Sequence, residues 1–303
     1  MNYAFLGYAK AQSAMEYLMT YGWAILIIAV VLGALFELGV FSGAFFMPHV
    51  PPGSCHVFRP YGPRTVGSIN LEGECQGALP QYVAGFNGNS YVEQSDGFSF
   101  INNANQNVTI SIWVNPSSPN GDIVDELGQS SIDTDWHDTW IDLVNGNVQI
   151  RVWDLSCVDL GSIPLNSWSN IVMILTYNGV ALNYSGYING VYRGSGSGSR
   201  SVPGGSSIMY YPLGPSDFTN CGDGSAAFSG EMANYQFYNT SLSKQSIYEI
   251  YQEGIGGSPI NLQNLVGWWP LNGNGNDYSG NNNDGTAAKV IYTSNWESGY
   301  TQP

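Results

Sequence analysis

The sequence predicts a mainly β protein: an antiparallel β-sandwich that follows an N-terminal hydrophobic α-helix. The helix is predicted by residues 21–47, in which Glu37 is the only charged residue among 27. The sandwich is predicted by short segments after residue 80 in which β-branched and aromatic residues alternate with polar ones. Clusters of Gly, Asn and Ser separate these segments at the spacing that is typical of sandwich strands.

Composition supports an ordered fold and excludes one class of partner. The 303 residues are 43% hydrophobic and 14% aromatic, which is far from the composition of a disordered chain. Eight Lys and Arg residues against 23 Asp and Glu residues give a net charge of −15. The field of such a chain repels a phosphate backbone, so we expect no nucleic acid partner.

Residues 12–47 form the predicted helix. At a rise of 1.5 Å per residue it is long enough to cross a bilayer core of about 30 Å. A short polar leader, residues 1–11, precedes it, whereas a cleavable secretory peptide would place its apolar region first. We therefore expect a transmembrane helix with the rest of the chain on the cell surface.

The junction between leader and helix reads KAQSAMEY from Lys10 to Tyr17. It resembles the class III signal peptide of archaeal type IV pilin-like proteins, which a prepilin-type peptidase cuts ahead of the apolar helix. The resemblance implies cleavage between Ala11 and Gln12. It also implies self-association in a filament, where Glu16 pairs with the new α-amino group of a neighbouring subunit. The alternative is a plain membrane anchor with Glu16 at the headgroup level.

Residues 48–79 are rich in proline and are predicted to form a neck. The four cysteines are an even number without CxxC spacing, which disfavours zinc and permits two disulfides in three pairings. Proximity favours Cys55 with Cys75 and Cys157 with Cys221. Free thiols are the alternative, and disulfides would agree with an extracellular location.

Residues 80–303 are predicted to hold the sandwich. Strand patterns are clearest at residues 108–114, 148–153 and 171–177. We assign three tryptophans in or beside these patterns to the core: Trp113, Trp153 and Trp168. Ser243 and Gly254 are the expected caps of a helix over residues 244–253. The alternating Gly and Ser of residues 194–199 are interpreted as a flexible connection.

An ordered set of segments between residues 80 and 255 resembles the laminin-G-like, concanavalin A-like jelly rolls. The segments are Phe86-Asn87-Gly88, Val108 to Pro116, Trp168 to Gly179, Tyr187 to Val191 and Phe228 to Glu231. The resemblance implies a jelly-roll sandwich that attaches to a glycan or another cell-surface ligand.

One departure from that family is informative. A segment like residues 265–271 normally opens the domain, whereas here it lies near the C-terminus. A sandwich without its first strand would expose a sheet edge. We therefore expect residues 265–303 to supply the opening strand, either to their own molecule or to a neighbouring one. Return within the same molecule is favoured, because residues 254–264 are a long enough connection.

No motif favours an enzyme. Glycosidases need two carboxylates placed across the scissile bond, and no strand shows that spacing. An acidic cluster around His137 is interpreted as a solvated loop; its carboxylates are Asp133, Asp135, Asp138 and Asp142. The family resemblance implies a structural calcium ion at Asp277, with Glu231 as a further acidic position. The alternative is that Asp277 caps its own turn.

Ligand candidates are the aromatic residues in loop-like segments, which could stack on sugar rings: Trp136, Trp140, Tyr210 and Tyr211. Glycosylation sequons occur at Asn107, Asn183 and Asn239. The sequence thus predicts a cell-surface, pilin-like subunit or adhesin that presents a laminin-G-like head for attachment. The alternative is a monomeric, membrane-anchored carbohydrate-binding protein.

Overall fold

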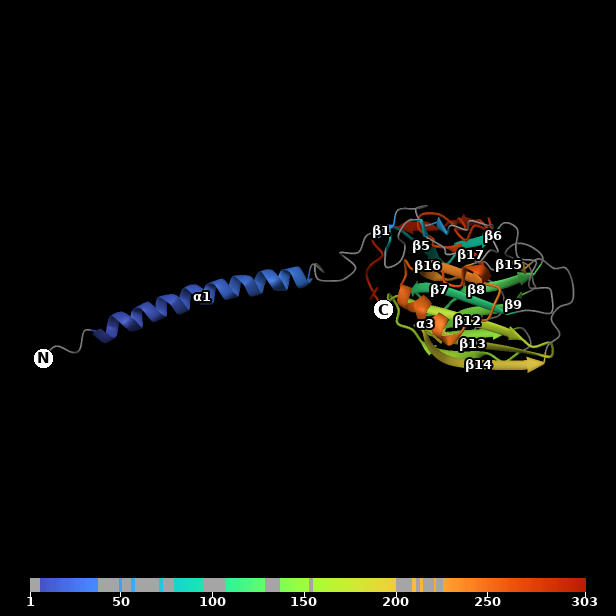
Figure 1. The fold of residues 1–303 in the computed structure, drawn as a ribbon, viewed down its shortest axis with the longest axis horizontal. Coiled ribbons are helices and arrows are strands. Elements are labelled where there is room, and N and C mark those ends of the chain that lie inside the picture. The colour runs from blue at the N-terminus through green and yellow to red at the C-terminus, as the bar shows by residue number, and fades with distance from the viewer. Residues whose placement is uncertain are drawn as a thin grey trace. The chain divides into compact units, whose positions relative to one another are not determined.

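The computed structural model describes residues 6–37, 49–50, 56–57, 71–72, 79–94, 107–128, 137–152, 155–199, 209–210, 213–214, 221 and 226–303. The chain divides into two compact units, residues 1–47 and residues 48–303 (Figure 1).

The first unit is the helix α1 (Leu6–Glu37), which confirms the prediction of an N-terminal helix. The apolar side chains of residues 21–34 are exposed, as at Trp23, Ile25 and Val30. In the described residues no helix reaches the length and apolar character that crossing a membrane requires. The start of α1 at Leu6 includes part of the predicted leader.

The second unit is built almost entirely of short strands. Their bounds are β1 (His49–Val50), β2 (His56–Val57), β3 (Leu71–Glu72), β4 (Leu79–Pro80), β5 (Val83–Asn87), β6 (Tyr91–Gln94), β7 (Val108–Pro116), β8 (Gly121–Gly128), β9 (His137–Val144), β10 (Asn147–Val152), β11 (Val158–Ser162), β12 (Ser169–Tyr177), β13 (Ala181–Ile188), β14 (Val191–Ser199), β15 (Met209–Tyr210), β16 (Ser229–Tyr238), β17 (Leu265–Trp269), β18 (Gly285–Ala288) and β19 (Ile291–Thr293). One α-helix, α3 (Lys244–Glu253), and a 3₁₀ turn, η2 (Leu262–Asn264), accompany them.

Two sheets form the antiparallel sandwich that the sequence predicts. The larger sheet has the order β14-β13-β12-β7-β16-β5-β19, with β17 beside β16. The smaller sheet has the order β11-β10-β9-β8-β15. The main core lies between the two sheets, where Ile110 and Ile112 of β7 belong to the same buried cluster as Ile141 and Leu143 of β9.

A second, smaller core lies between the larger sheet and α3. Val172 and Ile174 of β12 pack in one cluster with Ile247 and Ile250 of the helix. The predicted bounds of α3 are confirmed. The Ser243 side chain accepts a hydrogen bond from the Ser246 backbone nitrogen, and Gly254 follows the last turn with a positive φ.

The C-terminal segment adds strands to the sandwich of its own chain. β17 pairs with β16, β18 with β6, and β19 with β5, all antiparallel. The return within one molecule is therefore the arrangement in this structure. Because β17 pairs with the second half of β16 and β19 pairs with β5, residues 265–303 cover edges of the larger sheet that would otherwise be open.

Near the end of the chain, Trp296 and Tyr300 form an aromatic cluster with Trp168, which we call the clasp. Trp296 is 1% exposed, and its indole nitrogen donates to the Pro80 carbonyl at 3.0 Å. Its own carbonyl accepts from the Trp168 indole at 3.1 Å. The Trp296 ring also meets the rings of Trp168 and Tyr300 edge to face. The clasp thus joins the C-terminus to the entry of the domain and to the turn before β12.

Two of the three tryptophans assigned to the core are confirmed. Trp113 is 2% exposed and Trp168 is 6% exposed, whereas Trp153 lies outside the described residues. Trp113 stacks on Tyr251 of α3 at a ring distance of 5.8 Å. This contact helps to hold α3 against the larger sheet.

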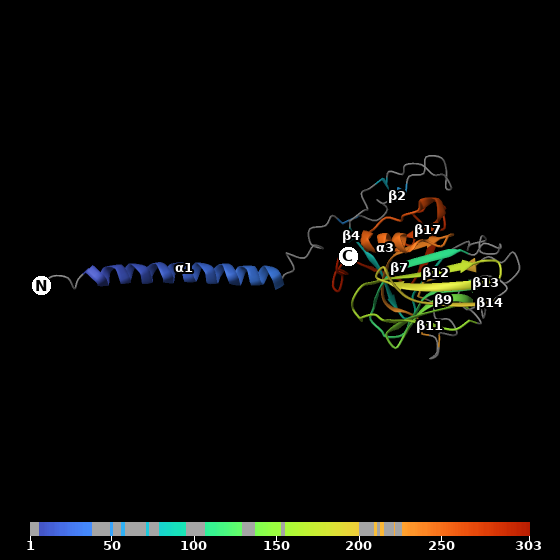
Figure 2. The same cartoon turned by 60° about the horizontal axis from the view of Figure 1, so that its bottom comes forward.

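The prediction of a flexible connection at residues 194–199 is wrong, because these residues form the second half of β14, at the edge of the larger sheet (Figure 2). Their glycines face the interior. A Cβ at Gly196 would overlap the buried Tyr184 ring, and one at Gly198 would overlap the Leu155 side chain. Glycine therefore lets this strand approach the layer beneath it, which any larger residue would prevent.

The prediction of a solvated loop around His137 is wrong for its second half. Residues 137–144 form β9, and Asp142 is only 1% exposed. The register places Asp142 opposite Asp122 of β8, which is 4% exposed. Two further aspartates of the cluster precede His137. These residues, Asp133 and Asp135, lie outside the described part of the chain.

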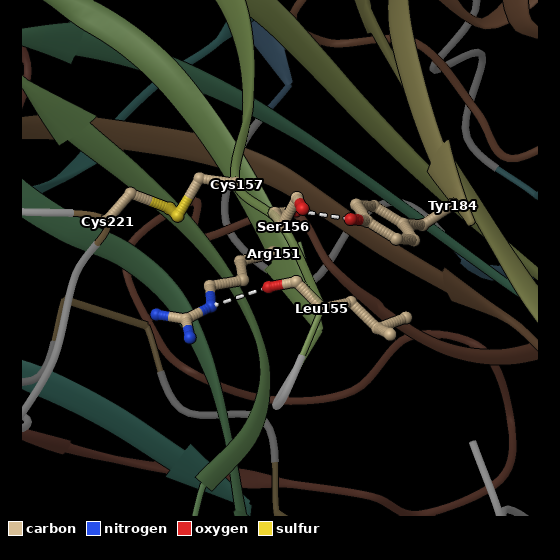
Figure 3. Close-up of a disulfide and its surroundings, with 6 residues drawn as sticks. All are labelled: Arg151, Leu155, Ser156, Cys157, Tyr184 and Cys221. Carbon is tan, nitrogen blue, oxygen red and sulfur yellow. Dashed lines mark hydrogen bonds between the residues drawn. A yellow bond between two sulfur atoms is a disulfide. The ribbon is translucent and has the colours of Figure 1, made fainter. Parts of the chain in front are cut away.

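The disulfide between Cys157 and Cys221 is confirmed, with their Cα atoms 5.7 Å apart (Figure 3). Two hydrogen bonds fix the chain just before it. The Tyr184 hydroxyl donates to the Ser156 carbonyl, and the Arg151 Nε donates to the Leu155 carbonyl at 3.1 Å. Cys55 and Cys75 lie outside the described residues, so their pairing stays a prediction.

Candidate functional site

The outer face of the larger sheet changes from apolar to polar toward its β14 edge. Under α3 the face carries Val172 and Ile174, which belong to the smaller core. Further along β12 the next outward residue is Thr176, and the register sets it opposite Asn183 of β13. Asn183 in turn lies opposite Ser197 of β14. One row across three strands is therefore made of hydroxyl and amide groups.

A depression of about 240 Å³ lies on this polar face. Its lining residues are Thr176, Asn183, Tyr184, Ser185, Ser195, Gly196 and Ser197. Side chains alternate along a strand, so the lining residues Ser185 and Ser195, which are also register partners, point outward together. The Tyr184 side chain points into the core beneath Gly196, and both residues line the depression between the outward-facing side chains.

The local sequence explains why the wall is polar. In β14, Gly and Ser alternate from Gly194 to Ser199, and the glycines take the inward positions. All the serines of this run, Ser195 and Ser197 among them, therefore face solvent and are exposed. Serine on the outer face is compatible with an edge strand because it adds no apolar surface.

The rim of the depression is held in place by side-chain contacts. The Thr176 and Ser241 hydroxyl oxygens lie 2.7 Å apart in a hydrogen bond, which ties β12 to the segment before α3. The Tyr192 hydroxyl donates to the Ser195 Oγ at 2.8 Å. The Tyr192 ring is 46% exposed, and the Lys244 Nζ lies 5.4 Å from its centre. The rim therefore offers one exposed aromatic face beside the hydroxyl rows.

The lining suits binding rather than acid-base chemistry. Hydroxyl and amide groups can both donate and accept hydrogen bonds, and among the described residues no Asp, Glu, His, Lys or Arg lines the depression. Tyr184 is its one titratable lining residue. Burial raises the pKa of its hydroxyl, against a smaller lowering by Arg151, so this phenol stays neutral at physiological pH. A molecule rich in hydroxyl groups is the natural complement.

Two of the four predicted aromatic ligand residues belong to strands of the smaller sheet. Trp140 lies in β9 and Tyr210 in β15, the two strands that flank β8 in the smaller sheet. Trp136 and Tyr211 lie outside the described residues. The sheet thus brings the Trp140 and Tyr210 positions near one another, on a different sheet from the depression, and their role in binding stays a prediction.

Sequence reasoning missed Tyr192, the exposed aromatic residue at the rim. It follows the Asn189-Gly190 turn between β13 and β14, where the sequence indicated only a hairpin. The alternation of side chains along β13, carried across the hairpin to Tyr192, could have identified this tyrosine as an outward-facing residue. Tyr192 opposes Tyr187 across the hairpin, and their rings meet edge to face at 5.6 Å.

Asp277 is the centre of a hydrogen-bonded turn that holds β17. Its Oδ1 accepts from the backbone nitrogens of Trp268 at 2.9 Å and Ser279 at 2.8 Å. Its Oδ2 accepts from the Asn283 nitrogen at 2.9 Å and the Ser279 hydroxyl at 2.8 Å. Burial raises the pKa of the Asp277 carboxyl, and these hydrogen bonds act in the opposite direction.

This arrangement does not fit a calcium site at Asp277. Four donors occupy the carboxylate oxygens, which leaves them no lone pair for a cation. Glu231 belongs to another set of contacts, accepting from Asn115 at 3.0 Å and from Thr293 at 3.1 Å. No group of three or more His, Cys, Asp and Glu side chains in the described part of the chain could hold a metal ion. Calcium binding elsewhere stays a prediction.

The three sequons lie at one end of the larger sheet. Asn183 and Asn239 are exposed. Asn107 is half-buried, and its side-chain oxygen accepts from the Tyr177 nitrogen at 3.2 Å. Glycosylation at these positions stays a prediction. A glycan on Asn183 would fill the depression, because that side chain is part of its wall.

Comparison with known families agrees with this fold. Residues 86–248, more than half of the chain, match a laminin G family described as the concanavalin A-like lectin/glucanases superfamily. The chain belongs to this superfamily. The match confirms the predicted jelly-roll resemblance and includes every residue of the depression. Strands β17 to β19 of this lectin/glucanase domain lie outside the matched range. Because the superfamily description names glucanases as well as lectins, the absence of catalysis stays a prediction.

Similar solved structures come from several organisms. The native heptameric SAP-like pentraxin from Limulus polyphemus has a TM-score of 0.48 and 16% identity, covering 70% of this chain and 94% of the pentraxin. A protein from Bacteroides ovatus with a proposed carbohydrate-binding role has a TM-score of 0.48 and 12% identity, covering 76% of this chain and 64% of that one. Domain 4 of an extracellular arabinanase from Geobacillus stearothermophilus, in complex with arabinotriose, has a TM-score of 0.39 and 20% identity, covering 56% and 76%. A comparison with curated proteins found no match.

Proposed function

We propose that this chain is a cell-surface attachment protein whose concanavalin A-like domain binds carbohydrate in the depression over β12, β13 and β14. The observation that carries the proposal is the lining itself. Hydroxyl and amide groups converge there from three strands, without a charged residue among them. Membership of a superfamily that includes lectins supports the same class of ligand.

The physical match is between a polyhydroxyl ligand and a polyhydroxyl wall. Each hydrogen bond gained in place of water contributes about 1 kcal/mol net, so a few such bonds give weak binding. Tyr192 adds an apolar ring face on which a pyranose could stack. A dissociation constant in about the micromolar to millimolar range is expected, and many heads on one surface would raise the avidity.

Filling the depression should abolish this binding. We expect Ser197→Trp to weaken the affinity for a bound oligosaccharide at least about tenfold, because the indole would occupy the space between Asn183 and Ser195. The measurement is binding of the full chain, solubilised in detergent, to an oligosaccharide array. Ser199→Trp is the matched control, since Ser199 is exposed on the same face of β14 but does not line the depression. Equal binding by the two variants would contradict the proposed site.

We also propose that the N-terminal region makes this protein a pilin-like subunit. Support comes from the junction at Ala11 and Gln12, from Glu16, and from the helix α1, which contains these residues and continues through the apolar segment. In this proposal a prepilin-type peptidase removes residues 1–11, and the retained helix anchors the chain in the membrane or packs it in an extracellular filament. The head would then be displayed outside the cell, where the Cys157–Cys221 disulfide is stable.

The processing proposal predicts a mature chain that begins at Gln12. Loss of Lys10 leaves 7 Lys and Arg against 23 Asp and Glu, a net charge of −16. N-terminal sequencing of protein from native membranes is the measurement, and an intact Met1 would contradict cleavage.

Glu16→Gln should remain membrane-associated but lose filaments in electron micrographs, whereas Glu37→Gln, the same change at the far end of α1, should keep them. Unchanged filaments in Glu16→Gln would instead favour the monomeric anchored protein.

A further inference from the structure

We infer that the depression selects an anionic sugar, one that carries a carboxylate or a sulfate ester beside its hydroxyl groups. The inference rests on the proposed carbohydrate binding and narrows its ligand class. The observations behind it are the distribution of charge along the chain and the position of two cations at the rim.

Acidic residues avoid this part of the protein. The chain has 23 Asp and Glu residues, yet none occurs between Asp159 and Asp217. That acid-free stretch contains the whole of β12, β13 and β14, which carry every residue of the depression. Arg193 and Arg200, two of the eight basic residues, fall within it. In a chain of net charge −15, β12, β13 and β14 therefore add no acidic side chain of their own to this face.

One exposed cation stands beside the exposed aromatic ring of the rim, and a second is the neighbour of that residue in the chain. Arg193 follows Tyr192 directly in β14 and is exposed. Lys244 is the first residue of α3, and its Nζ lies 5.4 Å from the centre of the Tyr192 ring. The N-terminus of α3 adds the positive end of the helix dipole in the same place. Because Tyr192 donates to Ser195, the Lys244 charge lies near the hydroxyl wall.

One described carboxylate of α3 and one of β11 have other partners. Glu249 of α3 accepts a hydrogen bond from the Gln245 side chain at 3.0 Å. Asp159 of β11 accepts from Asn147 at 3.0 Å and from the Gly161 nitrogen at 2.7 Å. Neither of them lines the depression. An incoming anion would therefore find Lys244 and Arg193 without an acidic side chain in the lining to compete for them.

The test uses matched pairs of oligosaccharides, each a neutral chain printed beside the same chain with a terminal uronate or with one sulfate ester. The full-length protein in detergent should bind the anionic member about five- to tenfold more tightly, the effect of one or two partly exposed ion pairs. Raising the salt concentration should reduce this preference. A preference for the uronates alone would show that the protein recognises a carboxylate. A preference for both the uronates and the sulfate esters would show that it recognises negative charge in general.

Variants test which residues cause the preference for the anionic oligosaccharide. Arg193→Gln combined with Lys244→Gln should bring the anionic and neutral members to equal affinity while neutral binding stays within about twofold. Lys289→Gln is the matched control, because Lys289 is exposed next to β19, at the opposite edge of the larger sheet from β14. Equal binding of both members by the unaltered protein would overturn the inference and leave carbohydrate binding intact. An unchanged preference in the double variant would overturn it as well, and binding of neither member would overturn both proposals.

Discussion

Replacing Trp296 by alanine should lower the free energy of unfolding by about 3–5 kcal/mol, the range measured for large aromatic residues in protein cores. The side chain is 1% exposed, and its ring meets Trp168 and Tyr300 edge to face. Alanine would leave a cavity among these rings. It would also leave the Pro80 carbonyl without the indole donor that it has at 3.0 Å.

The measurement is urea unfolding of the chain from residue 48 onward, which forms a compact unit of its own. Tyr248→Ala is the matched control, because this aromatic residue of α3 is 48% exposed and its loss should change stability by less than about 1 kcal/mol. If Trp296→Ala behaved like the control, the clasp would contribute nothing to the stability of the sandwich.

Asp277→Ala should be nearly as damaging, with a loss of about 3–5 kcal/mol. The buried carboxylate accepts four hydrogen bonds, two of them from the backbone nitrogens of Trp268 and Asn283. Alanine would leave these donors unpaired and release the turn that holds β17. Because β17 pairs with β16 near the centre of the larger sheet, we expect global unfolding rather than local fraying.

Urea unfolding again measures the effect, and Asp284→Ala is the comparison. Asp284 is exposed, and its carboxylate accepts a hydrogen bond from the Asp277 nitrogen at 2.9 Å, so its loss should cost only about 1 kcal/mol. The same experiment with added calcium or a chelator should leave the unaltered protein unchanged. A large stabilisation by calcium that vanishes in Asp277→Ala would show that this carboxylate is a metal ligand after all.

Elements with strong local signals could be predicted from the sequence. The β-branched and apolar residues within 108–114 and 171–177 predicted β7 and β12, and both strands are buried on their two faces. The caps Ser243 and Gly254 predicted α3, because capping acts within a few residues of each helix end. The Cys157–Cys221 pairing followed from simple proximity.

Features that depend on distant contacts could not be predicted. The Gly and Ser of residues 194–199 carry no apolar pattern, and they form a strand because Tyr184 and Leu155 fill the space beneath them. For Asp277 the sequence left two readings, and only its contacts with Trp268 and Asn283 decide between them. The depression was missed for the same reason, since its wall combines three strands whose polar residues have no common motif.

The most direct test of carbohydrate binding by this face is a crystal structure of residues 48–303 with the tightest-binding oligosaccharide from the array. The account predicts that the sugar lies over β12, β13 and β14, with its hydroxyl groups within hydrogen-bond distance of Asn183, Ser195 and Ser197 and one ring against Tyr192. A sugar bound instead on the smaller sheet, at the strands that carry Trp140 and Tyr210, would contradict it.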